Sequence, residues 1–454
     1  MVLKEDGNIW AWGNNYFGQC GDGTTGGIKS PRRVIGLTDV VFIAVGEGHS
    51  LAIKQDKTLW AWGANYCGSL GIGSMVDKNI PVQVNTMAGI RKVAAGTHNN
   101  LALRDDGTVF AWGLNHYGQL GDGTTVNRHS PVQVQGISNI INISAREAHN
   151  LAIEQNGVIW TWGSNLDRQL GEGTEAIRSS VPVQVQNIAG VKEIAAGGNF
   201  SMALKNDETV WCWGSNMYYE LGSERIFYSK TPVQVVGLTG ITAIDAGYGF
   251  GLALRSDKTV WGWGANYDGQ LGDNSTRSRG RPMQVDLLTD VKIISAGGFH
   301  SMAVKQDGTL WVWGDNRFGQ LGMPNLARSL VPIEFNGFGS FNQSREIELN
   351  CEAGESYLIA LTATDLTGNL EELTFTINYD PQLLTPMYIH QNQPLGLGQV
   401  PGTNLVILNQ SAGEIEGSLN KTITATQQWQ GTIGVIKFVA NDNGATTVGC
   451  RMSE

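Results

Sequence analysis

A ten-residue motif that returns about every fifty residues constrains this chain more than any other feature. It opens with Trp-Gly-x-Asn and closes with glycine, and successive copies lie 50 residues apart except for one interval of 51. The seven copies begin at Trp12, Trp62, Trp112, Trp162, Trp213, Trp263 and Trp313. A fixed period of this length indicates a repeat architecture, in which each unit buries its apolar surface against its neighbours.

Each repeat unit contains four short strands joined by turns. An apolar strand such as residues 301–304 precedes a two-residue turn such as Asp307-Gly308, and an alternating strand containing Trp-x-Trp follows. A variable loop then leads to a proline-initiated strand, as at residues 131–134, and the unit closes with an apolar strand ending in Ala-Gly. Four-stranded sheets repeated seven times predict an all-β fold, a seven-bladed β-propeller over residues 1–340.

The motif residues are interpreted as blade architecture. Residues two apart on a strand share a face, so the two tryptophans of each Trp-x-Trp pair point the same way and fill the space between face-packed sheets. Thirteen of the fourteen tryptophans, or all but Trp429, belong to this repeated position. The asparagine of Gly-x-Asn tolerates left-handed backbone and hydrogen-bonds nearby main chain, which predicts a turn role.

Two copies, residues 95–122 and 296–322, closely match the run Ala-Gly-x-x-His-Ser-Leu-Ala-Leu-x-x-Asp-Gly-Thr-Val-Trp-x-Trp-Gly-x-Asn-x-x-Gly-Gln-Leu-Gly. This run resembles the repeat of the regulator of chromosome condensation family, and the resemblance covers residues 1 to about 335. The family implies a seven-bladed propeller. Its name also raises the alternative of a guanine-nucleotide exchange factor for a small GTPase.

The first repeat lacks its opening strand. Residues 1–4 align with residues 202–205 and 302–305, so the visible sequence begins inside a strand, without the Ala-Gly-x-x-His-Ser lead. We expect the protein to extend further upstream. The alternative is that residues 337–350 supply the missing strand and close the ring.

The repeats stop near residue 336, and strand-like runs separated by Gly, Pro and Asn clusters follow. They predict an antiparallel β-sandwich over residues 341–454. Residues 373–381 and 434–440 resemble cohesin-like and related carbohydrate-binding sandwiches, which implies an extracellular scaffold or adhesion module. We therefore expect an extracellular or cell-surface protein, with the cytoplasm as the alternative.

Composition excludes several classes of partner. The formal net charge of −10 opposes bulk attraction to nucleic acid or an anionic membrane, and no apolar run approaches the length of a membrane span. Three cysteines within the repeats, Cys20, Cys67 and Cys212, are interpreted as small buried apolar side chains. Cys351 and Cys450 lie in the tail and can pair only in an oxidising compartment.

The histidines and carboxylates of the repeat do not form a catalytic or metal-binding pattern. One repeat position holds His49, His149 and His300, but Asn99, Phe200 and Phe250 in other copies. Phenylalanine cannot bind a metal or transfer a proton, so these histidines are expected to cap a turn. Acidic residues after the repeat glycine occur once per blade, which predicts structural salt bridges: Asp22, Asp122, Glu172 and Asp273. We expect no enzyme, no cofactor and no metal.

Cations recur on equivalent variable loops in every repeat. They are Lys29, Lys78, Arg128, Arg178, Arg225, Lys230, Arg277, Arg279, Arg281 and Arg328. One interpretation is that each pairs with an acidic residue of a neighbouring blade. The functional interpretation is a ring of positive charge for an acidic protein face or polysaccharide, centred on Arg277, Arg279 and Arg281.

The sequence favours a non-enzymatic, monomeric binding or scaffold protein whose propeller loops engage a protein or glycan partner. Besides the exchange factor, two alternatives remain open. One is a propeller that inhibits a secreted enzyme, and the other is a carbohydrate-active enzyme that uses the sandwich as an accessory module.

Overall fold

The computed structural model describes residues 1–323 and 326–335 with their side chains, and beyond residue 335 it describes only the backbone of the strands. The chain divides into two compact units, Met1–Gly337 and Phe338–Glu454. Among the residues that the structure describes, no helix is long and apolar enough to cross a membrane.

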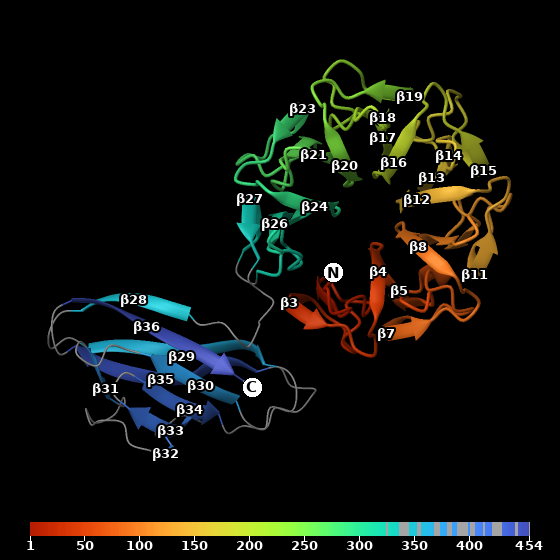
Figure 1. The fold of residues 1–454 in the computed structure, drawn as a ribbon. Coiled ribbons are helices and arrows are strands. Elements are labelled where there is room, and N and C mark those ends of the chain that lie inside the picture. The colour runs from red at the N-terminus through yellow and green to blue at the C-terminus, as the bar shows by residue number, and fades with distance from the viewer. Residues whose placement is uncertain are drawn as a thin grey trace. The chain divides into compact units, whose positions relative to one another are not determined.

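The first unit is the predicted seven-bladed β-propeller (Figure 1). Six blades are antiparallel four-stranded sheets in chain order, and three strands are described for the first blade. The blades comprise, in order, β1 (Val2–Leu3), β2 (Ile9–Gly13) and β3 (Ile28–Arg33); β4 (Val40–Val45), β5 (His49–Lys54), β6 (Leu59–Gly63) and β7 (Lys78–Gln83); β8 (Ile90–Ala95), β9 (Asn99–Arg104), β10 (Val109–Gly113) and β11 (Arg128–Gln133); β12 (Ile140–Arg146), β13 (His149–Glu154), β14 (Ile159–Ser164) and β15 (Arg178–Gln184); β16 (Val191–Ala196), β17 (Phe200–Lys205), β18 (Val210–Ser215) and β19 (Tyr228–Gln234); β20 (Ile241–Ala246), β21 (Phe250–Arg255), β22 (Val260–Gly264) and β23 (Arg279–Gln284); and β24 (Val291–Ala296), β25 (His300–Lys305), β26 (Leu310–Asp315) and β27 (Arg328–Glu334). The first strand of each complete blade lies nearest the ring centre (Figure 1).

The second tryptophan of each Trp-x-Trp pair joins its blade to the preceding one. All seven are buried, and each indole Nε1 donates a hydrogen bond of 2.8–3.0 Å to a backbone carbonyl in the motif of the preceding blade. The pairs are Trp62–Gln19, Trp112–Ser69, Trp162–Gln119, Trp213–Gln169, Trp263–Glu220, Trp313–Gln270 and Trp12–Gln320. The last pair joins the first blade to the seventh, so the ring closes through the same contact as every other interface.

Five of these carbonyls accept a second hydrogen bond from the same neighbouring blade. The donor is the side chain that follows the histidine position, at 2.6–2.8 Å: Ser50, Asn100, Asn150, Ser201 and Ser301. In the sixth blade the equivalent residue is Gly251, where a Cβ would lie 2.5 Å from Cζ2 of Trp263. Both lone pairs of the carbonyl are thus used inside the interface, where an unpaired polar group is costly.

His49 and His149 hydrogen-bond to the next blade, so the predicted turn-capping role is wrong for these two histidines. His49 Nε2 donates to Asn100 Oδ1 at 2.6 Å, and His149 Nε2 donates to Ser201 Oγ at 3.0 Å. The imidazole must be the donor, because the amide and the hydroxyl already donate to the carbonyls described above. Burial lowers the pKa of His49 to about 4 and that of His149 to about 3, so both rings are neutral at pH 7.

The second unit contains nine described strands in two antiparallel sheets. In sheet order they are β28 (Arg345–Cys351), β36 (Gly444–Ser453), β30 (Leu373–Asn378), β34 (Glu414–Leu419), β33 (Leu405–Ser411) and β32 (Gly398–Gln399), then β29 (Ser356–Leu366), β35 (Trp429–Ala440) and β31 (Leu384–Met387). The sandwich packing and the cohesin-like resemblance depend on side chains outside the described residues, and they stay predictions. Because residues 345–350 belong to β28, which pairs with β36, they do not complete the first blade, and residues 336–344 lie outside the described part.

The strand register bears on the two cysteines of the tail. It sets Cys351 opposite Gly444, and Cys450 opposite Arg345, at opposite ends of the β28–β36 pair. A disulfide needs Cα atoms within about 7 Å, whereas each strand residue advances about 3.3 Å. This register therefore opposes the pairing that the sequence left open.

Replacement of one interface tryptophan tests the contact between blades. We expect Trp213→Phe to lower the free energy of unfolding by about 2–4 kcal/mol, because it removes a buried hydrogen bond and leaves a cavity. The matched control is Trp211→Phe in the same strand, which we expect to cost about 1 kcal/mol or less. Trp211 is half-buried, its Nε1 donates to Thr209 of its own blade, and its ring centroid lies 5.4 Å from Lys205 Nζ, a contact that phenylalanine can keep. Urea unfolding followed by circular dichroism measures both, and equal losses would contradict the assignment.

Candidate functional site

The long loops between the third and fourth strands of the blades lie at one end of the propeller. In an antiparallel sheet this end also carries the turns between the first and second strands. A backbone hydrogen bond of 2.7 Å from Ala64 N–H to the Gly48 carbonyl joins the two connections in the second blade. We call this end the loop face, made by residues 14–27, 64–77, 114–127, 165–177, 216–227, 265–278 and 316–327, of which 324 and 325 lie outside the description.

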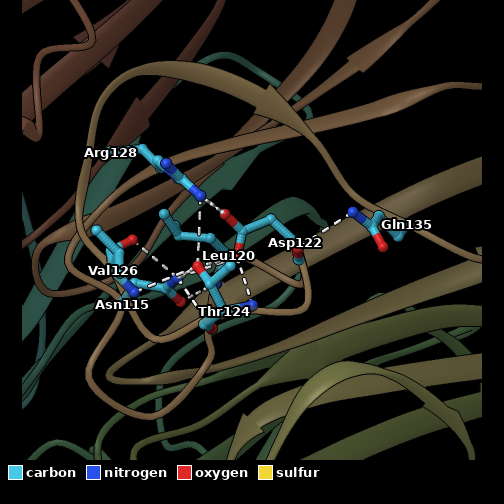
Figure 2. A network of polar contacts seen from close by, with 7 residues as sticks. All are labelled: Asn115, Leu120, Asp122, Thr124, Val126, Arg128 and Gln135. Carbon is cyan, nitrogen blue, oxygen red and sulfur yellow. Dashed lines mark hydrogen bonds and ion pairs between the residues drawn. The ribbon is translucent and has the colours of Figure 1, made fainter.

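One buried asparagine holds each loop in shape. In the third blade, Asn115 Oδ1 accepts the Leu120 N–H at 2.9 Å, while Nδ2 donates to the carbonyls of Thr124 and Val126 at 3.2 and 3.0 Å (Figure 2). The equivalent bond to the amide five residues on is present in all seven blades, at 2.7–3.0 Å. The expected main-chain bonding of the asparagine is confirmed, and the loops are fixed from within.

The repeat carboxylates also support the loops. Asp122 accepts hydrogen bonds from Thr124 and forms an ion pair of 2.8 Å with Arg128 (Figure 2). Asp22 pairs with Arg32 at 2.8 Å, and Asp273 with Arg279 at 2.6 Å. Glu172 accepts from Asn165 Nδ2 at 2.8 Å without an ion pair in the described residues. Three of the four predicted salt bridges are therefore observed, each inside one blade.

The ten loop cations do not form one continuous ring. Arg128 and Arg279 pair within their own blade, so the expectation of a partner in the neighbouring blade is wrong for them. Lys230 does pair with Glu175 of the preceding blade, and two others donate to backbone carbonyls of the preceding blade: Arg178 to His116 and Arg328 to Tyr267. Seven of the ten have no ion pair among the described residues, and five of these seven make no side-chain hydrogen bond there either: Lys29, Lys78, Arg225, Arg277 and Arg281.

A set of exposed apolar side chains on the loop face escaped the sequence analysis. They stand four or five residues after the second tryptophan, occur in all seven blades, and are 37–71% exposed. They are Tyr16, Phe17, Tyr66, Tyr117, Leu166, Met217, Tyr218, Tyr267 and Phe318. We call them the apolar ring. The second limbs of several of these loops expose further apolar residues, namely Val76, Val126, Ile177 and Phe227.

The apolar ring was detectable from the sequence. The positions lie inside the repeated motif, whose other residues form the blade architecture. Yet these positions lie one or two residues after the asparagine of the turn, beyond the end of the strand. Side chains there no longer point alternately toward the core and away from it. Large apolar residues at such a place contribute to a surface and not to packing between blades.

A single arginine crosses the centre of the ring. Arg146 stands where five other copies carry glycine, namely Gly46, Gly96, Gly197, Gly247 and Gly297. Its guanidinium donates to the carbonyls of Ala246 and Ala296 in the sixth and seventh blades, at 2.6 and 3.1 Å, and lies 5.1 Å from the ring centroid of Tyr248. The fourth blade is thereby tied directly to two blades across the channel.

Three further charged groups on the inner strands stand within electrostatic range of one another. Asp245 accepts the amide of Ala296, and burial raises its pKa. Burial raises the pKa of Glu193 to about 7, with Asp245 adding to the rise and Lys92 opposing it. Lys92 donates to Asn142 of the next blade, and burial lowers its pKa. Through these hydrogen bonds Asp245 and Lys92 connect the inner strands of neighbouring blades. The described residues contain no cluster of side chains that could hold a metal ion.

Known sequence families match the propeller region. A model of the RCC1-like domain matches residues 135–368, which is 234 of the 454 residues. The regulator of chromosome condensation repeat matches residues 6–53, 56–103 and 106–153. Human protein RCC2 is 36% identical over 55 residues, and human E3 ubiquitin-protein ligase HERC2 is 44% identical over 54 residues. Each match spans 12% of this chain, but only 10% of RCC2 and 1% of HERC2.

Solved structures share the fold. Yeast RCC1 (Prp20), solved with Kap60, superposes with a TM-score of 0.68 and 24% identity over 74% of this chain and 85% of that one. Saccharomyces cerevisiae Prp20p, reported with its binding properties to Gsp1p and histones, superposes with a TM-score of 0.67 and 22% sequence identity. The match covers 75% of this chain and 89% of Prp20p. Human WBSCR16 superposes with a TM-score of 0.65 and 24% sequence identity, over 72% of this chain and 93% of that one. At these identities the likeness extends to the fold alone.

The channel charges predict a pH dependence of stability. Glu193 keeps its proton up to about pH 7 when folded but loses it near 4.5 when unfolded. The free energy of unfolding should therefore fall as pH rises from about 4.5 to 7, by at most ~3 kcal/mol at ~1.4 kcal/mol per pKa unit. Glu193→Gln should remove this part of the fall, as measured by urea unfolding across that range. Glu5→Gln, on an exposed turn, is the control, and an unchanged profile in Glu193→Gln would contradict the prediction.

Proposed function

This chain belongs to the RCC1-like family, and on that premise we propose that it is a non-enzymatic protein whose loop face binds a partner protein. The observation that carries the proposal is the apolar ring, with at least one exposed large apolar side chain in each of the seven blades. These side chains recur at equivalent positions on one face, and exposed apolar patches mark interaction sites on soluble proteins. Aromatic residues and methionine, which make up most of the ring, are enriched at protein interfaces.

The loop face is suited to a protein because it is both apolar and rigid. Each loop is fixed by its asparagine, so little conformational freedom is lost when a partner docks. Arg225 and Arg277 lie on the loop face without an ion pair among the described residues, and they add positive charge for a partner with an acidic face. The relatives solved as yeast RCC1 with Kap60, and as Prp20p with its binding to Gsp1p and histones, engage proteins. A glycan partner stays a prediction from the sequence.

Three further parts of the proposal come from the sequence and stay predictions. They are the monomeric state, the location outside the cell or on its surface, and a scaffold role for the second unit. Exchange-factor activity is the second candidate function, favoured by membership of the family. Release of labelled nucleotide from a small GTPase would distinguish it from simple binding.

Substitutions confined to one face test the proposal. The triple variant Tyr16→Ser, Tyr66→Ser, Tyr117→Ser removes exposed rings from three adjacent blades, and we expect it to retain less than about a tenth of the protein partners captured from the source organism's extract by the full chain. Quantitative mass spectrometry of the captured proteins provides the measurement.

The matched control replaces exposed apolar side chains at the opposite end of the propeller. Val41 lies next to the start of β4, and Val236 follows the end of β19, both away from the loop face. Val41→Ser with Val236→Ser should leave capture unchanged. If the triple variant captured as much as the wild type, or if the control lost capture equally, the loop face would not be the binding surface.

A further inference from the structure

The loop of the fifth blade, residues 216–227, departs from the repeat at Tyr219. Five other copies have glycine at this position, with φ between 76° and 81°: Gly18, Gly68, Gly118, Gly269 and Gly319. Tyr219 keeps the left-handed backbone, with φ 70°, although a Cβ is disfavoured there. Strain of this kind persists at functional positions when the surrounding structure holds it.

The neighbouring blade is adapted to this departure. In the other copies, a Cβ on the loop glycine would collide with the outer strand of the next blade, as Gly68 would with His129. The residue of the sixth blade that corresponds to His129 is Gly280, which removes the opposing side chain. A Cβ on Gly280 would collide with Glu224, so the loop of the fifth blade packs closely on β23. The side chain that occupies the space beside Gly280 is Glu224, which belongs to the same loop as Tyr219.

The remaining departure of this kind has a structural explanation that Tyr219 lacks. Arg168 in the fourth blade also has φ 70°, and its side chain forms an ion pair with Glu175 at 2.5 Å. The Tyr219 side chain is 38% exposed, and its hydroxyl makes no hydrogen bond within the described residues. No ion pair or hydrogen bond of the side chain among the described residues explains the strained position, which leaves the Tyr219 ring partly exposed.

Tyr219 lies in a group of exposed apolar side chains that we call the aromatic patch. Its members are Met217, Tyr218, Tyr219, Phe227, Tyr228 and Tyr267. The Asn216 N–H donates to the Phe227 carbonyl at 2.9 Å, which joins the two limbs of the loop, and the rings of Tyr218 and Tyr267 meet edge to face at 5.9 Å. Phe227 is 85% exposed, the highest value for a large apolar residue in the described part of the chain.

Unpaired guanidinium groups border the aromatic patch. Arg225 lies within the loop. Arg277 lies three residues before Gly280, against which the loop packs, and Arg281 directly follows it. All three are exposed and have no ion pair among the described residues, whereas Arg279 between them is neutralised by Asp273. Glu224 is the one exposed carboxylate of the loop, so the border carries net positive charge.

We propose that the aromatic patch is the docking site for an acidic segment of a partner protein, with an apolar anchor between its carboxylates. The proposal rests on the proposed function and narrows it to the fifth and sixth blades. Exposed rings of tyrosine and phenylalanine receive an apolar anchor with little loss of side-chain entropy. Arginine at the border pairs with carboxylate through two parallel hydrogen bonds, which selects acidic over basic segments.

The probe is a fluorescein-labelled peptide of twelve residues with a central Phe-Leu pair flanked by Asp and Glu. Two companions replace every acidic residue by Lys, or by Asn and Gln. Fluorescence anisotropy with the full chain should show saturable binding of the acidic peptide, about tenfold tighter than of either companion. Tyr219→Gly with Phe227→Ser should weaken this binding about tenfold, and Arg225→Glu with Arg277→Glu should reverse the preference toward the lysine peptide.

The matched control is Tyr117→Ser with Val126→Ser, which alters the equivalent loop of the third blade and should leave peptide binding unchanged. Tyr219→Gly alone should keep or raise the melting temperature, because glycine relieves the left-handed strain, so lost binding would not reflect unfolding. Absent binding of the acidic peptide, equal binding of all three peptides, or binding unaffected by the patch substitutions overturns the proposal.

The two proposals fail in distinguishable ways. If substitutions in the first three blades reduce partner capture while the acidic peptide does not bind, the loop face remains the interface and the aromatic patch is excluded. If neither the loop-face triple variant nor the patch variants reduce capture, both proposals fall.

Discussion

The fold depends on one backbone carbonyl per interface, placed where two blades meet. It accepts an indole N–H from the next blade at all seven interfaces and a second side-chain hydrogen bond at five of them. A tryptophan is needed because it combines a large apolar surface with a single donor that reaches across the interface. This explains why the same residue recurs at a fixed period and why the ring closes without a special joint between the seventh and first blades.

The repeat allowed the architecture of the propeller to be predicted from the sequence. Strand positions, the number of blades and the burial of the second tryptophan all follow from periodicity, because each depends on local pattern repeated seven times. The sequence also predicted that Asp122 and Asp273 form structural salt bridges, and each pairs with an arginine of its own blade. Periodicity could not show that His49 donates to Asn100, because it aligns the repeats without showing which position of one blade meets which position of the next.

The candidate site was harder to predict because it depends on which side chains remain unpaired. The loop cations look equivalent in the sequence, yet Arg279 is bound to a buried aspartate while Arg277 and Arg281 are free of ion pairs. Exposure is likewise a property of the folded loop, so Tyr66 and Phe318 were hidden within a motif that also carries the core tryptophans. The informative positions were those that break the repeat, such as Tyr219 and Arg146, and single departures gain meaning only from their neighbours.

Arg146 gives the propeller a mechanical asymmetry. If the seven similar interfaces were the only contacts between blades, we would expect each blade to shift by a similar small amount against the next. The hydrogen bonds from Arg146 to the carbonyls of Ala246 and Ala296 add direct contacts between the fourth blade and the sixth and seventh blades. Tyr219 and Tyr267 belong to the fifth and sixth blades, within the arc that Arg146 spans. We therefore expect a partner that docks there to meet a surface that moves less than the loops of the first three blades.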